Sequence, residues 1–301
     1  MRGGIVIGYE ETPQGRDALE LGGRFARALA ARPLLVNVMP WPGDLAGVAD
    51  VEAAMEEEAG ALLARAAAQL EGLKPETLAL ANPSPGNALY TTAHETDAVL
   101  IVVGSSHRGA IGRVLAGNVA RSLLGGAPCA VAVAPRGYAD DPPHAVGRVG
   151  VAFDGSEEAR AALDTAVGLA RAEHAAIRLL TVAEPARYGL GTALTILTEA
   201  EFRDVEREAK QRALDEALAA LPPELERDGS LLEGPPAAAI AEAATDCDLL
   251  VLGSRGYGPI RQVLLGDTAG AVIDSARCAV LVVPRAAGPD PLGLAASGGG
   301  P

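Results

Sequence analysis

The sequence contains two copies of one pattern, and this internal repeat restricts the fold more than any other feature. The segment GRVLAGNVARSLLGGAPCAVAVAPR at 112–136 aligns with RQVLLGDTAGAVIDSARCAVLVVPR at 261–285 at a constant separation of 149 residues. Nearer the amino terminus, IVIGYEET from Ile5 aligns with VGVAFDGS from Val149, and the separation is 144 residues. Glycine, cysteine and proline landmarks at one fixed separation indicate a duplication, with an indel of about five residues between the aligned segments.

Each copy alternates short β-branched runs with Ala-rich helical stretches, which is typical of a parallel sheet covered by helices on both faces. We therefore predict an α/β protein of two tandem open-sheet, Rossmann-like domains, each with five strands and four helices. The predicted strands are 4–9, 34–39, 77–81, 98–103 and 130–134 in the first copy, and 149–153, 177–182, 230–232, 248–252 and 279–283 in the second. The longest predicted helices are 14–31, 51–73 and 199–220.

The length of 301 residues fits two domains of about 150 residues each. The segment GYADDPPHAVG at 137–147 is a Pro/Asp/Gly-rich break midway along the chain, which predicts a linker between domains at 1–136 and 148–285. The stretch 286–301 is rich in Gly, Ala and Pro without periodicity, so we predict a disordered tail.

The net charge is −14, and no basic cluster offsets it, which argues against nucleic acid and anionic membranes as partners. A small anionic ligand remains compatible, because backbone amides bind phosphate without a basic surface. The three cysteines and four histidines show no metal-ligand spacing, and the start MRGGIVIGYE resembles no signal peptide. No apolar run approaches the length of about 18 residues that a membrane span needs. We expect a cytoplasmic protein without a resident metal.

The residues that follow the fourth strand of the second copy have the spacing of a phosphate-binding loop. Gly253 and Gly256 are followed by Gly266, and then Asp267 and Thr268 open a helix. Glycines let backbone amides approach phosphate oxygens, and the open amides at a helix start favour the same anion. In parallel sheets ligands bind beyond the carboxyl ends of the strands, so we expect Asp154, after the first strand, to face this loop and accept ribose or base hydrogen bonds.

Motifs of the common nucleotide-dependent enzymes are missing from the sequence. It has no GxxxxGK[ST] loop and no GxGxxG after a first strand, and neither GxSxG nor HExxH occurs. We therefore predict a protein that is not an enzyme, or at most a slow ATP hydrolase. Two alternatives stay open: the glycines serve only turns and helix caps, or the chain is a nucleotide-independent interaction scaffold with degenerate sites.

The pattern G-x2-G-x9-G, with an acidic residue after the first strand, resembles the universal stress protein domain over nearly the whole chain. The resemblance implies strand order 3-2-1-4-5, binding of ATP or another adenine nucleotide with or without Mg²⁺, and a regulatory role in stress responses through an unknown protein partner. It also implies that Val182 and, in the first copy, Val38 contact adenine. Finally, it implies domain pairing through the last strands, within the chain by 131–134 against 281–283, with a further homodimer left open.

The two copies depart differently from the pattern that they resemble. In the first copy the residues at the corresponding positions are Glu10, Gly104, His107, Gly117 and Asn118, so a side chain replaces the second glycine and the acidic residue is longer. We predict weaker binding there. In the second copy Asp267 stands where the pattern has Ser or Thr, and an ionised carboxylate only accepts hydrogen bonds. Thr268 is the predicted substitute donor, and the second copy is the predicted main site.

Overall fold

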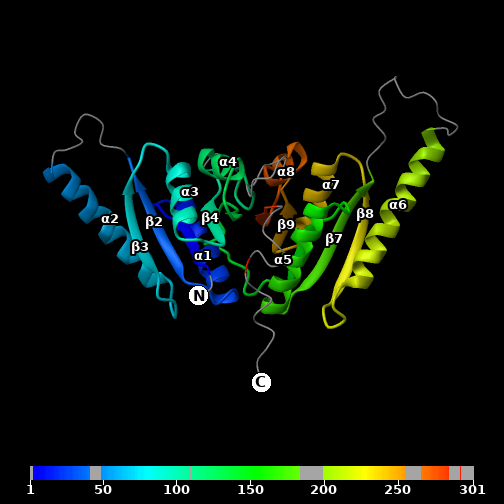
Figure 1. Ribbon diagram of the computed structural model, residues 1–301, viewed down its shortest axis with the longest axis horizontal. Coiled ribbons are helices and arrows are strands. Elements are labelled where there is room, and N and C mark those ends of the chain that lie inside the picture. Colours follow the sequence, from blue (N-terminus) through cyan, green and yellow to red (C-terminus); the bar gives the residue numbers. More distant parts are fainter. Residues whose placement is uncertain are drawn as a thin grey trace.

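The computed structural model describes residues 3–40, 49–106, 108, 110–183, 199–254, 266–284 and 292. Its ten strands form one continuous sheet with the order β3-β2-β1-β4-β5-β10-β9-β6-β7-β8 (Figure 1). Each half has the order 3-2-1-4-5 that the resemblance implies. The strands are β1 Ile5–Gly8, β2 Pro33–Met39, β3 Glu76–Ala81, β4 Leu100–Gly104, β5 Ala130–Ala134, β6 Arg148–Ala152, β7 Ala176–Ala183, β8 Arg227–Glu233, β9 Leu249–Gly253 and β10 Ala279–Val283.

The two halves join through their last strands, as the resemblance implies. Strand β10 pairs antiparallel with β5, with Leu281 opposite Ala132, and the other strand pairs that the structure describes are parallel. The expectation of two five-stranded sheets is thereby refined, because the halves share one sheet. Both joining strands are fully buried, as expected for apolar strands covered on both faces.

Eight α-helices of the described chain cover the two faces of the sheet. They are α1 Pro13–Ala28, α2 Ala49–Gln69, α3 Pro85–Glu95, α4 Asn118–Leu124, α5 Glu157–Glu173, α6 Glu199–Ala220, α7 Pro236–Ala243 and α8 Asp267–Ile273, and a 3-10 turn, η2, spans Ala244–Asp246. One apolar core lies under α1, α2, α5 and α6, and a second lies under α3, α4, α7 and α8. Each core continues from one copy into the other, so the copies pack as one body.

Capping residues set where the helices next to the strand ends begin. The Thr12 hydroxyl accepts a hydrogen bond from the Gly15 amide, and Pro13 occupies the first helical position of α1. In the second copy the Ser156 hydroxyl caps α5 by accepting from the Ala159 amide at 3.2 Å. Both helices therefore start immediately after the loops that carry Glu10 and Asp154.

The segment 137–147, predicted as a linker, packs against the first copy. The buried carboxylate of Asp17 in α1 accepts the backbone amides of Gly137 and Ala139, each at 2.9 Å. Tyr138 is buried, and the guanidinium of Arg24 donates to the carbonyl of Pro143. These contacts hold the segment 137–147 against α1. Of the predicted tail, 286–301, only Leu292 lies within the described residues, and its side chain is buried.

Candidate functional site

A cavity of about 540 Å³ lies at the carboxyl ends of β6, β7 and β9, where α5 and α8 begin. This volume falls within the range of about 300 to 1,000 Å³ that is usual for small-molecule sites. Five predicted residues of the second copy line it: Asp154, Val182, Gly253, Gly266 and Thr268. Gly256 lies outside the described residues, and Asp267 is described only as the first residue of α8.

The loop after β6 orients Asp154 at this cavity. One carboxylate oxygen, Oδ1, accepts the amide of Ser156 at 2.9 Å, and Gly155 between them has a φ of 85°. That backbone conformation favours glycine. The carbonyl of Asp154 accepts a hydrogen bond from Lys210 Nζ at 3.2 Å, which ties the loop to α6. The acidic residue is therefore held by the turn and by a neighbouring helix.

Helix α6 supplies Glu206 and Lys210 to the cavity lining, and sequence reasoning missed both. The sequence predicts α6 correctly as 199–220, but the pattern predicts that all polar residues of this helix face solvent. Which of them meets the cavity depends on how α6 packs on β7 and β8. Periodicity along one helix carries no information about that packing.

The first glycine of each loop has a packing role that is visible without any ligand. A Cβ added to Gly253 would lie 2.5 Å from the carbonyl oxygen of Glu158, in the first turn of α5. A Cβ at Gly104 would collide with the backbone of Gln14, in the first turn of α1. Both glycines let a helix start close to the end of the fourth strand. Part of the predicted glycine pattern is thus explained by helix–sheet packing.

The last glycine of the pattern occupies the N-cap position of the following helix in both copies. Gly266 precedes α8 and Gly117 precedes α4, each with an extended backbone and without a side-chain cap hydrogen bond. The first amides of each helix therefore lack a capping side chain from that position. Thr268 and Ala269 of α8 line the cavity of the second copy, so the start of this helix meets the same space as Asp154.

The first copy has a corresponding cavity of about 760 Å³. Its lining includes the predicted residues Glu10, Val38, Gly104, Gly117 and Asn118, and His107 lies outside the described residues. Arg108 and Arg121 also line this cavity. A neighbouring cavity of about 680 Å³ shares Glu10 and Val38 and extends towards α2. The first copy thus retains a cavity of at least comparable size.

Comparison with known proteins places both halves of the chain in one family. The model of the universal stress protein family matches residues 1–135 and again 146–284. The chain belongs to the universal stress protein family. A universal stress protein of Thermus aquaticus is 38% identical over 135 residues, covering 44% of this chain and 95% of that relative. One from Mycobacterium tuberculosis is 33% identical over 191 residues, covering 62% of each chain.

A solved structure of a universal stress protein from Archaeoglobus fulgidus supports the same tandem architecture. It matches 94% of this chain and 98% of its own, with a TM-score of 0.69 and 20% sequence identity. At that identity the likeness shows the fold. This tandem universal stress protein therefore shares its two-domain arrangement with a solved structure as well as its family with the sequence relatives.

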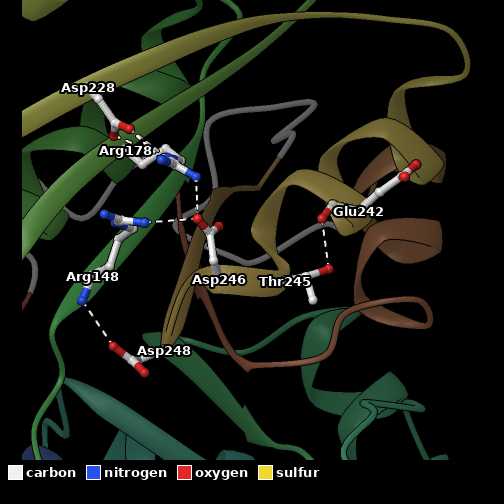
Figure 2. A network of polar contacts seen from close by, with 7 residues as sticks. All are labelled: Arg148, Arg178, Asp228, Glu242, Thr245, Asp246 and Asp248. Carbon is white, nitrogen blue, oxygen red and sulfur yellow. Dashed lines mark hydrogen bonds and ion pairs between the residues drawn. The ribbon is translucent and has the colours of Figure 1, made fainter.

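A network of charged groups in the second half of the universal stress protein lies at the opposite, amino-terminal ends of its strands (Figure 2). Arg178 on β7 contacts Asp228 on β8 and Asp246 of η2, each at 2.5 Å, and Arg148 on β6 also reaches Asp246 at 2.8 Å. These contacts raise the pKa of Arg178, with the hydrogen bond to Asp228 as the largest cause. The network connects strands β6 to β9 and is remote from the cavity.

Three further properties of the described chain bear on function. No group of three or more metal-ligating side chains occurs among the residues that the structure describes. Within the same residues, no helix combines the length and the apolarity needed to cross a membrane. Burial raises the pKa of the Cys129 thiol to about 12, and Cys129, Cys247 and Cys278 are all buried and free. Such thiols are protonated at neutral pH and shielded from reagents.

Proposed function

We propose that this universal stress protein binds an adenine nucleotide, ATP in the first instance, mainly in the cavity of the second copy. Occupancy of that cavity serves regulation through a protein partner rather than chemical turnover. The observation that carries the proposal is that five predicted residues, four from sequence spacing and Val182 from the family resemblance, line one cavity of suitable volume. They come from β6, β7, β9 and α8, which are distant along the chain.

Each part of a nucleotide finds suitable chemistry in this cavity. The uncapped start of α8 at Gly266 suits the phosphates, since helix amides and the helix dipole favour anions. The Asp154 carboxylate, held at the mouth by its turn, suits the ribose hydroxyls. Val182 offers an apolar surface at the end of β7 for the base. Thr268 brings a hydroxyl donor to the phosphate side, and Lys210 brings a cation.

Mg²⁺ is compatible with the same cavity. It favours oxygen ligands and is commonly held by one or two carboxylates together with substrate phosphates. Asp154, Glu158 and Glu206 all line the cavity. Because no group of three or more metal-ligating side chains comes together among the described residues, one of these carboxylates would hold the ion together with the phosphates, and the ion would neutralise phosphate charge there.

The test uses one matched pair of substitutions at equivalent positions. Val182→Arg fills the cavity of the second copy with a bulky charged side chain, and Val38→Arg does the same in the first. We expect isothermal titration of the full chain with ATP and Mg²⁺ to show two classes of site: Val182→Arg removes the tighter one and leaves the weaker binding of the first copy, whereas Val38→Arg largely preserves the tighter one. Circular dichroism checks that both variants are folded. Equal losses would contradict the preference for the second copy, and no heat from the unsubstituted chain at millimolar ATP would refute the function.

A nucleotide-independent scaffold is the second candidate function. One observation favours it: Gly104 and Gly253 are required for helix–sheet packing, so their presence needs no ligand. The same titration separates the two candidates. A chain without ATP heat that still captures its partner protein would support the scaffold.

A further inference from the structure

A side chain of the second copy reaches into the wall of the first copy's cavity. Asp274 directly follows α8, and its Oδ1 accepts the backbone amide of Ala116 at 3.0 Å. Its Oδ2 accepts the Arg121 guanidinium at 2.6 Å. Arg121 donates in turn from Nε to the carbonyl of Ala116 at 2.9 Å, which closes a three-membered polar cluster. Ala116 and Arg121 both line the cavity of about 760 Å³.

This contact fixes the loop of the first copy where it enters α4. The Ser105 hydroxyl accepts the amide of Leu115 at 2.7 Å and donates to its carbonyl, so the two ends of the loop are tied together. A backbone hydrogen bond from the amide of Val114 to the carbonyl of Ala276 adds a second tie to the other copy. Ala116 is then followed by Gly117, the N-cap of α4. Asp274 therefore fixes Ala116, the residue through which the chain enters the uncapped N-terminus of α4.

The contact has no counterpart in the opposite direction. Helices α4 and α8 are equivalent at the repeat separation, so Asp274 corresponds to Gly125 and Arg121 corresponds to Gly270. Glycine has no side chain with which to form either half of the cluster. In Figure 1 the two helices lie next to each other across the junction of the sheet. The first copy therefore has no carboxylate at the position of Asp274, and the second copy has no guanidinium at the position of Arg121.

We propose that Asp274 is a positioning residue for the first cavity, which makes this cavity a composite of both copies. The ligand class is the phosphate-bearing nucleotide of the proposed function, on which the inference rests. Asp274 does not contact the ligand. It holds the amide and carbonyl of Ala116 and the guanidinium of Arg121 in the geometry that the start of α4 needs. Without it the loop loses its fixed entry into α4, and binding in the first cavity weakens.

The experiment isolates the first cavity by using the full chain with Val182→Arg as the background. We expect Asp274→Ala to weaken ATP binding by up to about tenfold, the limit reached when ligand binding must restore the full order that one hydrogen bond to a charged group supplied. Asp274→Asn should weaken binding less, because its amide oxygen still accepts from Ala116. Glu224→Ala is the control: it removes a comparable ion pair with Arg171, whose partners line neither cavity, and should leave affinity unchanged.

A second measurement needs no ligand. Hydrogen exchange of the ligand-free chain, followed by mass spectrometry, should be faster in 110–117 for Asp274→Ala than for the control. Unchanged exchange would overturn the positioning role whether or not ATP binds. Faster exchange with unchanged affinity would overturn its relevance to binding. Tighter binding would also overturn it, by showing that Asp274 only masks Arg121 from phosphate. Absence of ATP heat in both the Val182→Arg and Val38→Arg chains would instead contradict the proposed function.

Discussion

Replacing Gly253 by alanine should destabilise the second copy, because the new methyl group has no room. Its Cβ would lie 2.5 Å from the carbonyl oxygen and 2.6 Å from the carbonyl carbon of Glu158, so the start of α5 would have to move. That helix end is fixed by the Ser156 cap and by the buried side chain of Ala159. Overpacking costs about 1–3 kcal/mol, and the lower entropy of an unfolded alanine chain offsets about 0.4–1 kcal/mol. We expect a net loss of about 1–2 kcal/mol.

Urea unfolding followed by circular dichroism measures this loss, with Gly117→Ala as the matched control from the same motif. A Cβ on Gly117 would meet its nearest atom, in Ser106, at an ordinary 3.6 Å, and its backbone is extended, so alanine fits there. We expect Gly117→Ala to lower the midpoint less than Gly253→Ala, because it loses only the preference for glycine over alanine at an N-cap and creates no overlap. If Gly253→Ala unfolds at the same urea concentration as the control, the packing explanation is wrong. If it also loses ATP binding at full stability, the glycine serves the ligand instead.

Three further predictions concern stability and reactivity. Arg178→Leu, which introduces the residue of the first copy at the equivalent position, should cost about 1 kcal/mol at pH 7 in urea unfolding. Burial raises the pKa of Asp246. The charge and the hydrogen bond of Arg178 together lower this pKa by more than burial raises it, so the pKa lies below its usual value. The contribution of the ion pair is present above the unfolded pKa of about 3.9 and is lost as the pH falls through the lower folded pKa of Asp246. The free energies of unfolding of variant and parent should therefore converge as the pH falls below that folded pKa. Gly155→Ala should cost about 1 kcal/mol because φ is 85° there, and equal midpoints would contradict this. The buried thiols, with the pKa of Cys129 and of Cys247 raised to about 12 by burial, should react with a thiol reagent only after unfolding.

The sequence predicts most of the sheet because the fold depends on short apolar runs at repeated positions. The main error is β8, predicted as 230–232 but spanning Arg227–Glu233. Its first residues are polar and give no strand signal, yet they pair with β7, where Arg178 binds Asp228 across the strands. Cross-strand ion pairing of this kind is invisible in either strand alone. Of the helices predicted with bounds, 199–220 matches α6, and the ends of 14–31 and 51–73 lie within four residues of those of α1 and α2.

The residues of the candidate site also fall into two groups, those that the sequence predicts and those that it does not. Residues at strand ends and helix starts, such as Asp154 and Gly266, follow from local pattern and topology. Glu206 and Lys210 do not, because they reach the second cavity from a helix that is remote in sequence. Asp274 does not either, because it belongs to the other copy and contacts two residues that line the first cavity. The aligned repeat does contain a signal for the last of these. The first copy has Gly125 where the second has Asp274, and the second copy has Gly270 where the first has Arg121. These two differences mark a place at which the copies make different contacts.

Because the two copies are fused in one chain, the two sides of the interface between them can differ in sequence. In a symmetric homodimer every interface residue acts twice, so a carboxylate and an arginine that meet across the axis would meet at both related positions. In the tandem chain each position varies alone, and the Asp274–Arg121 contact occurs in one direction only. The joining strands are also wholly buried against each other, so a separated copy would expose an apolar edge at Val131 and Val133. The first cavity should therefore be studied in the intact chain, because the isolated first copy lacks both its neighbouring strand and the side chain that holds its loop.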